Sequence, residues 1–244
     1  MTEATLGVAP PAVARPASLV GRLDPRAKIV LVLGSLLVVL SEPAGALRPF
    51  APYYALILAL LLSARVPPVF LARRLAVVAP VIILAAALLL IAGGDAAGAE
   101  RSLSLLLRGF AAVALVTVLV ASERIGGILW GLSALGMPRL FCTLAAVTYR
   151  YALLLGDEAM RTERARRSRT PDGIRAGRLR TLGGQAALVF LRGWKRSRDV
   201  HHAMLARGFN GQFPFPAPGP LAAGNLFIVA TTLAAFIAVR VLWR

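Results

Sequence analysis

Five long apolar runs separated by short polar loops dominate the hydropathy pattern of the chain. They occupy residues 27–40, 50–64, 75–92, 103–121 and 224–243. A helix rises about 1.5 Å per residue and must cross about 30 Å of hydrocarbon, so a transmembrane helix needs about 20 mainly apolar residues. The last three runs meet this length, whereas the first two reach it only with flanking residues or by partial burial in a bundle. The pattern predicts an all-α, polytopic membrane protein with about five transmembrane helices, although four or six also fit.

The composition supports helical spans. Of the 244 residues, 58% are hydrophobic and only 16% are charged, and the mean hydropathy is +0.73. A soluble domain would carry about a quarter charged residues, so the apolar excess requires contact with lipid. A transmembrane β-barrel would alternate polar and apolar positions along each strand, which the continuous runs of Leu, Val, Ile and Ala do not.

A short stretch after the first run has the composition of a processing site. Ala44-Gly45-Ala46 resembles a signal-peptidase cleavage site. The arm before the run is long and several apolar runs follow it, which favours a retained span over a removed signal peptide.

Loop charge gives the predicted orientation. Basic residues precede the first run and fill the loop between the second and third runs, whereas the other two loops are mixed or acidic. Because positively charged loops stay on the cytoplasmic side, we expect a multi-pass protein of the bacterial inner membrane with a cytoplasmic N-terminus. The predicted organisation is a cytoplasmic arm, four spans, a cytoplasmic domain and a C-terminal span, at residues 1–25, 26–121, 122–218 and 219–244.

The predicted cytoplasmic segment is basic and helical. Residues 122–223 contain fifteen Arg and one Lys against six Asp and Glu. Amphipathic periodicity predicts helices at 129–135, 143–169 and 185–207. One side of the last helix carries Phe190, Trp194, Ser197, Val200 and Met204. A long insertion with this periodicity is typical of a functional domain rather than a passive loop.

Two of these helices end on an arginine. Ser168-Arg169-Thr170 precedes a Pro-Gly turn, and Ala206-Arg207-Gly208 ends at a glycine, which suits a C-terminal residue with positive φ. An arginine at a helix C-terminus is favourable to the helix dipole, so capping alone accounts for each one taken singly. Two such ends, each with a small residue before the arginine, predict a matched pair whose guanidinium groups bind carboxylates in grooves of a partner protein.

The chain lacks the residues that several kinds of function require. A phosphate-binding loop ends in Gly-Lys-Ser/Thr, and the only two lysines, Lys28 and Lys195, follow Ala27 and Trp194. We therefore expect that the chain is not an enzyme and binds no cofactor, and an ATP-driven role would require ATP bound by separate ATPase subunits. The apolar runs hold no Asp or Glu for an ion-coupled carrier or an intramembrane enzyme. Arg108, near the end of a run, is the clear candidate for charge within the membrane.

No metal site is predicted in the chain. His201 and His202 are neighbours and point about 100° apart on a helix, so they cannot readily share a metal ion. We expect them to be surface or interface residues. The single cysteine, Cys142, excludes an internal disulfide and is interpreted as a packing residue.

The basic segment also fits a second class of function, a membrane anchor whose basic face binds anionic lipid or nucleic acid. Juxtamembrane Lys and Arg contribute about 1 kcal/mol each near an anionic surface. Against this reading, Glu158, Glu163 and Asp199 interleave with the arginines on periodic helices. The pattern favours a protein partner and no nucleic acid.

Three stretches resemble one family, and the resemblance covers nearly the whole chain. The most specific stretch begins Leu191-Arg192-Gly193-Trp194-Lys195-Arg196-Ser197-Arg198-Asp199-Val200 and continues from Ala203 to Gly211. It is similar to the signature of the T component of energy-coupling factor transporters, closest to the cobalt and nickel branch (the CbiQ type). Leu23-Asp24-Pro25-Arg26-Ala27-Lys28 and the residues around Tyr149-Arg150-Tyr151 are also typical of that family.

The resemblance implies a transmembrane coupling subunit that works with two ATPases on the cytoplasmic side and a small substrate-binding membrane protein, the S component. In the family, two cytoplasmic helices end in Arg-centred motifs that insert into grooves of the ATPases. The motifs fall here on Ser168, Arg169 and Thr170 and on Ala206, Arg207 and Gly208. The first motif commonly ends in Gly, where this chain has Thr170. The cargo expected from the resemblance is cobalt or nickel, with a vitamin as the alternative.

Overall fold

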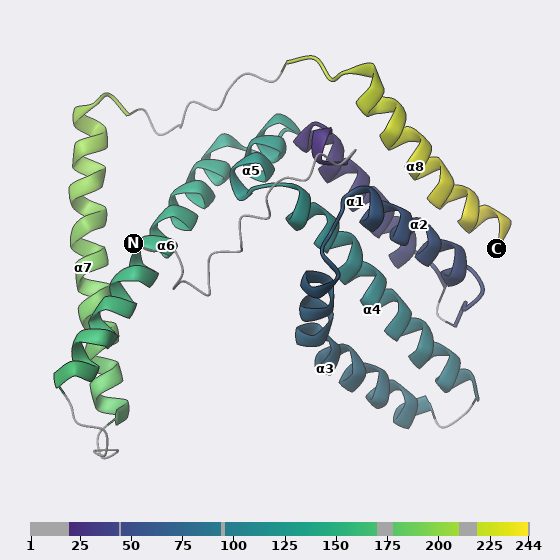
Figure 1. The fold of residues 1–244 in the computed structure, drawn as a ribbon, viewed down its shortest axis with the longest axis horizontal. Coiled ribbons are helices and arrows are strands. Elements are labelled where there is room, and N and C mark those ends of the chain that lie inside the picture. Colours follow the sequence, from purple (N-terminus) through teal and green to yellow (C-terminus); the bar gives the residue numbers. More distant parts are fainter. Residues whose placement is uncertain (1–19, 44, 94–95, 170–177, 210–218, 244) are drawn as a thin grey trace. The chain divides into compact units, whose positions relative to one another are not determined.

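The described residues of the computed structural model form an all-α protein, as predicted. They are residues 20–43, 45–93, 96–169, 178–209 and 219–243, and they fold into eight α-helices and one 3₁₀ turn without a β-strand (Figure 1). The helices fall into two compact units. We call α1–α5 and α8 the bundle, and α6 and α7 the hairpin.

The bundle contains the apolar helices. Its helices are α1 (Pro25–Leu40), α2 (Phe50–Ser63), α3 (Pro68–Gly93), α4 (Ala96–Ser122), α5 (Ile125–Ala134) and α8 (Ala223–Leu242), with the 3₁₀ turn Val20–Arg22 before α1. Helix α1 is central, because it packs against α4, α5 and α8, while α3 packs on α4. The core is apolar and includes Leu31, Val39, Tyr53, Leu115 and Phe236.

Helix α1 begins with two residues that fix its first turn. Asp24 is the N-cap, and its carboxylate accepts a hydrogen bond of 3.0 Å from the backbone N–H of Arg26. Pro25 occupies the first helical position, where its fixed φ suits a helix and its missing N–H costs no hydrogen bond. The stretch that resembles a family motif is therefore also a helix start signal.

Polar contacts join α2, α4 and α8 to the loop that follows α1. The Tyr53 hydroxyl lies 2.5 Å from Glu42 Oε1. The predicted intramembrane cation Arg108 reaches the loop after α1, where its Nη2 donates to the carbonyl of Pro43 at 2.6 Å. Arg240 of α8 donates to the carbonyl of Ser41 at 3.2 Å. The cations thus bind carbonyls of the loop that follows α1.

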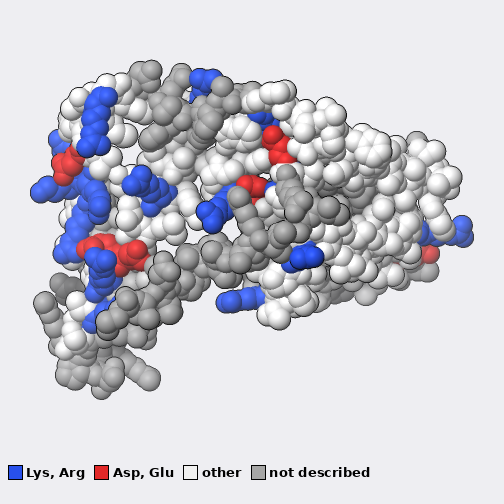
Figure 2. All heavy atoms as spheres, turned by 45° about the horizontal axis from the view of Figure 1, so that its top comes forward, with Lys and Arg blue, Asp and Glu red and all other residues white. Residues whose placement is uncertain are grey.

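Among the described residues, three helical stretches are long and apolar enough to cross a membrane: Pro68–Ile91, Gly98–Ser122 and Ala223–Leu242. They match the last three predicted spans. Helices α1 and α2 have 16 and 14 residues, so each is about 21–24 Å long. Large apolar side chains face outward along α3, for example Val77, Val81 and Ile91. Figure 2 shows an almost uncharged surface over much of the bundle, as expected of a protein in lipid.

The hairpin consists of two long amphipathic helices, α6 (Arg139–Arg169) and α7 (Arg178–Ala206). Helix α6 begins four residues before the predicted start, immediately after Pro138. Helix α7 begins seven residues early and continues through Gly183 and Gly184, because two glycines lower helix propensity without ending a helix. The shorter predicted helix at 129–135 corresponds to α5, which packs against α1 in the bundle.

The end of α2 provides a test of backbone strain. Arg65 has φ of 49°, a left-handed conformation that favours glycine. The amide of Val66 bonds to the carbonyl of Leu61, which fixes this turn. We expect Arg65→Gly to raise the stability of the detergent-purified protein by about 0.5–1 kcal/mol, measured as a higher melting temperature. Arg65→Lys keeps both the charge and the strain and should leave the melting temperature unchanged.

Candidate coupling site

The second predicted motif lies at a tightly defined helix end. Helix α7 ends at Ala206, and Gly208 has φ of 80°. The amide of Phe209 bonds to the carbonyl of Met204 at 3.0 Å, and that of Gly208 to Leu205 at 2.9 Å. This pair of bonds is the Schellman motif, which satisfies carbonyls that a helix end leaves free. It holds the backbone of Arg207 in one conformation.

The side chains of the second motif are accessible. Ala206, Arg207 and Gly208 are all exposed. The motif therefore presents a guanidinium group on a rigid support, with small neighbours that leave room for a partner surface. A guanidinium group in such a place can form directed bonds to carboxylates or to backbone carbonyls.

The first predicted motif is described only in part. Helix α6 runs to Arg169, as the sequence predicts, and Ser168 is exposed with its hydroxyl bonded to the carbonyl of Ala165 at 2.9 Å. Thr170 lies outside the described residues. The roles of Ser168, Arg169 and Thr170 stay predictions.

Ion pairs use some of the acidic residues of the hairpin internally. Glu158 of α6 pairs with Arg192 of α7, and Glu163 forms a two-pronged contact with Arg166 at 2.7 and 2.8 Å. An excess of exposed arginines remains, seen among the blue residues in Figure 2. It includes Arg161, Arg164, Arg196, Arg198 and Arg207.

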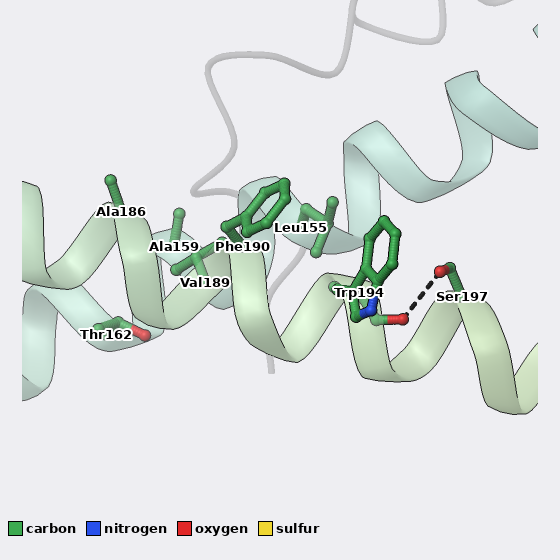
Figure 3. A pocket seen from close by; sticks show the side chains of 9 residues that line it. Leu155, Ala159, Thr162, Ala186, Val189, Phe190, Trp194 and Ser197 are labelled. Carbon is green, nitrogen blue, oxygen red and sulfur yellow. Dashed lines mark hydrogen bonds between the residues drawn. The ribbon is translucent and has the colours of Figure 1, made fainter.

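An apolar groove of about 650 Å³ runs between α6 and α7 (Figure 3). Leu155, Ala159 and Thr162 line it from α6, and α7 contributes Ala186, Val189, Phe190, Gly193, Trp194 and Ser197. The rings of Phe190 and Trp194 stack 6.3 Å apart and are 66% and 60% exposed. The sequence pattern placed Phe190, Trp194 and Ser197 on one side of the helix but indicated no role for them. Periodicity alone does not tell a buried face from one that stays open.

The other candidate residues differ in their exposure. The rings of His201 and His202 are 6.1 Å apart, and both residues are exposed. Cys142 is buried. Arg26 and Lys28, which count among the basic residues at the start of the first run and belong to a family motif, are also buried. Their contacts within the bundle give them a role that the sequence pattern did not indicate.

The capped end of α7 leads to a prediction about backbone order. An alanine at position 208 would have to adopt positive φ, so Gly208→Ala should destabilise the last turn of α7 by about 1 kcal/mol. Hydrogen exchange of the amides of residues 207–209 should then accelerate about fivefold. Gly156 lies inside α6, where an added Cβ would meet open space, so Gly156→Ala should leave these amides unchanged. Equal exchange in both variants would contradict the assigned cap.

Comparison with known proteins indicates the family to which the chain belongs. The family model described as CbiQ, cobalt transport protein, matches residues 16–215. A cobalt transport protein CbiQ from Rhodobacter capsulatus is 28% identical over 149 residues, which are 59% of this chain and 60% of that relative. The alignment thus spans less than two thirds of the relative's length. The match confirms the resemblance to the CbiQ type of T component, and the chain belongs to the CbiQ family of cobalt transport proteins.

Proposed function

We propose that the chain is the non-catalytic coupling subunit of an ATP-driven importer in the bacterial inner membrane. In this proposal the N-terminus and the hairpin are cytoplasmic, and Arg207 and Arg169 bind grooves on two ATPase subunits. The observation that carries the proposal is the exposed Arg207 at the capped end of a 29-residue helix. Family membership supports the same reading.

The hairpin has the mechanical properties that coupling needs. Closure of two ATPases on ATP would displace both arginine-tipped ends. Helices α6 and α7 have 31 and 29 residues, so each is about 45 Å long. Packed helices transmit shear or hinge motion without melting. Contact between Gly193 and Leu155, where a Cβ on the glycine would lie 3.1 Å from Leu155 Cδ2, supports a closely packed pair.

The groove between α6 and α7 supports a second partner contact. Phe190 and Trp194 expose large rings on a charged hairpin, and exposed apolar patches commonly mark interaction sites. We assign this groove to the substrate-binding membrane subunit, whose apolar surface would cover the rings. Movement of the hairpin would then tilt that subunit and release its cargo inside the cell.

We propose cobalt as the cargo. The family and its Rhodobacter capsulatus member are both described as cobalt transport proteins. In this proposal, the metal ligands belong to the substrate-binding subunit and ATP is bound by the ATPases. Nickel and vitamins are the alternatives to be tested.

Removal of the exposed guanidinium tests the coupling role. Arg207→Ala should weaken ATPase binding by about 2–5 kcal/mol, which is at least a 30-fold loss of affinity. Transport should fall accordingly, while membrane insertion stays normal, and Arg169→Ala should have a smaller effect. Arg198→Ala removes another exposed charge of α7 and is the matched control. The measurements are ATPase co-purification and uptake. Normal uptake and normal co-purification in the Arg169→Ala/Arg207→Ala double variant would sink the proposal.

A salt titration of the same complex separates coupling from lipid or nucleic-acid binding. Binding through the general basic surface should fall steeply as salt rises. A guanidinium packed into a protein groove should keep the ATPases bound over the same range. Identification of the co-eluting chains completes the test, because an ATPase and a small membrane subunit are expected.

Uptake measurements identify the cargo. Vesicles containing the complex should accumulate labelled cobalt in the presence of ATP, and unlabelled nickel should compete less well than unlabelled cobalt. Vitamin uptake without metal uptake would contradict the metal assignment while leaving the coupling role intact.

A further inference from the structure

Two cations in the first turns of α1 bind both ends of the segment that contains the hairpin. The first end is the turn between α4 and α5, at Ser122 and Glu123. The second end is Gly219, just before α8. Lys28 binds the first end and Arg26 binds the second. We call Arg26, Lys28, Glu123, Trp130 and Gly219 the α1 clamp.

Lys28 fixes the first end strongly. Its Nζ lies 2.7 Å from Glu123 Oε2, and it also donates to the carbonyls of Gly21 at 3.1 Å and Ser122 at 3.4 Å. The two charged side chains are only 2% and 6% exposed. A buried ammonium group is tolerated only when its charge is paired and its three donors have acceptors. Lys28 satisfies both conditions.

Arg26 holds the second end with fewer bonds. Its Nη1 donates to the carbonyl of Gly219 at 3.3 Å, and its guanidinium lies 4.7 Å from the centre of the Trp130 ring in α5. Within the described residues, Nε and Nη2 are buried without a hydrogen bond. The contact at Gly219 is therefore the weaker of the two.

Small residues bring α5 close enough for the clamp to form. A Cβ on Gly131 would lie 3.3 Å from the backbone of Pro25 and 3.4 Å from that of Arg26. A Cβ on Gly127 would overlap the carboxylate of Glu123, whereas one on its neighbour Gly126 would meet open space. Helix α5 is thus fitted to the start of α1 and to the ion pair.

We propose that the α1 clamp is the point at which displacement of the hairpin passes into the transmembrane helices, with Lys28 and Arg26 as positioning residues. A segment attached at two ends can transmit force only through what holds those ends. Both ends are bonded to one helix, α1, which packs against α4, α5 and α8. The inference rests on the proposed coupling function.

A double-variant cycle on the purified complex in proteoliposomes tests the ion pair. Lys28→Met and Glu123→Gln each remove one charge of the buried Lys28–Glu123 pair and keep the other. Each should reduce cargo transported per ATP hydrolysed at least tenfold, while ATPase co-purification stays within twofold of wild type. Lys28→Met/Glu123→Gln should be no worse than either single variant, because neither charge is then left unpaired. Arg124→Gln removes an exposed neighbouring charge and should have no effect.

Two neighbouring glycines test the position of the Glu123 carboxylate against α5 without removing a charge. Gly127→Ala should displace the Glu123 carboxylate, lower the transport-to-hydrolysis ratio, and accelerate hydrogen exchange at the start of α5 in the isolated chain. Gly126→Ala, one residue away, should leave the transport-to-hydrolysis ratio unchanged and should not accelerate exchange, because alanine has the higher helix propensity. Equal behaviour of the two variants overturns the proposal.

The outcomes separate the clamp from the coupling role itself. If Arg207→Ala releases the ATPases as expected but Lys28→Met transports normally, the clamp proposal alone is wrong. A loss of transport by Lys28→Met that only follows a loss of folded complex also overturns it, because the residue is then structural. If Arg207→Ala leaves coupling intact, the proposed function fails, while hydrogen exchange in Gly127→Ala still reports whether the clamp orders α5.

Discussion

The ammonium group of Lys28 is the constraint on which the arrangement of the bundle depends. A buried cation at the start of an apolar helix restricts which segments can pack there. Those segments must supply hydrogen-bond acceptors that pair the charge. The chain meets this demand with a carboxylate and two carbonyls from the 3₁₀ turn and from the α4–α5 turn. These bonds fix the register of α1 against the end of α4. The close contact of Gly131 with the same turn of α1 then fixes the position of α5.

The two units use charge in opposite ways. In the bundle, Arg108 and Arg240 bind backbone carbonyls, and Lys28 binds a buried carboxylate as well. In the hairpin, Glu158 pairs with Arg192 and Glu163 pairs with Arg166. The helices pack on each other where Gly193 meets Leu155, and among the described residues Arg161, Arg164, Arg196 and Arg198 are exposed. Arg207 lies just beyond the last residue of α7, where a Schellman motif fixes its backbone. A fixed backbone at an exposed helix end suits Arg207 to directed binding, and the exposed arginines along the helix faces add a general positive field.

Local sequence signals predicted most of the fold. They missed the true start of α7 and the contacts between residues far apart in the chain. Hydropathy predicted the all-α membrane architecture, and Gly208 and Pro138 marked helix ends because backbone conformation depends on neighbouring residues. The early start of α7 was missed because Gly183-Gly184 has a low helix propensity that the surrounding residues outweigh. The partnership of Lys28 with Glu123 was also missed. These residues are 95 positions apart, and no periodicity within either segment relates them. The motif around Arg207 was predicted from the arginine and its glycine, but its rigidity became evident only from the bonds of Phe209 and Gly208.

The shortness of α2 has a consequence for the surrounding lipid. Its 14 residues end at Ser63, its last turns expose Leu58 and Leu62, and Arg65 follows two residues after its end. A helix of about 21 Å falls roughly 9 Å short of an average hydrocarbon layer. Hydrophobic mismatch of this size is relieved when acyl chains next to the helix compress or headgroups descend toward its ends. The annulus of lipid beside α2 should therefore be thinner than the bulk bilayer, which lowers the cost of tilting any neighbouring membrane protein there.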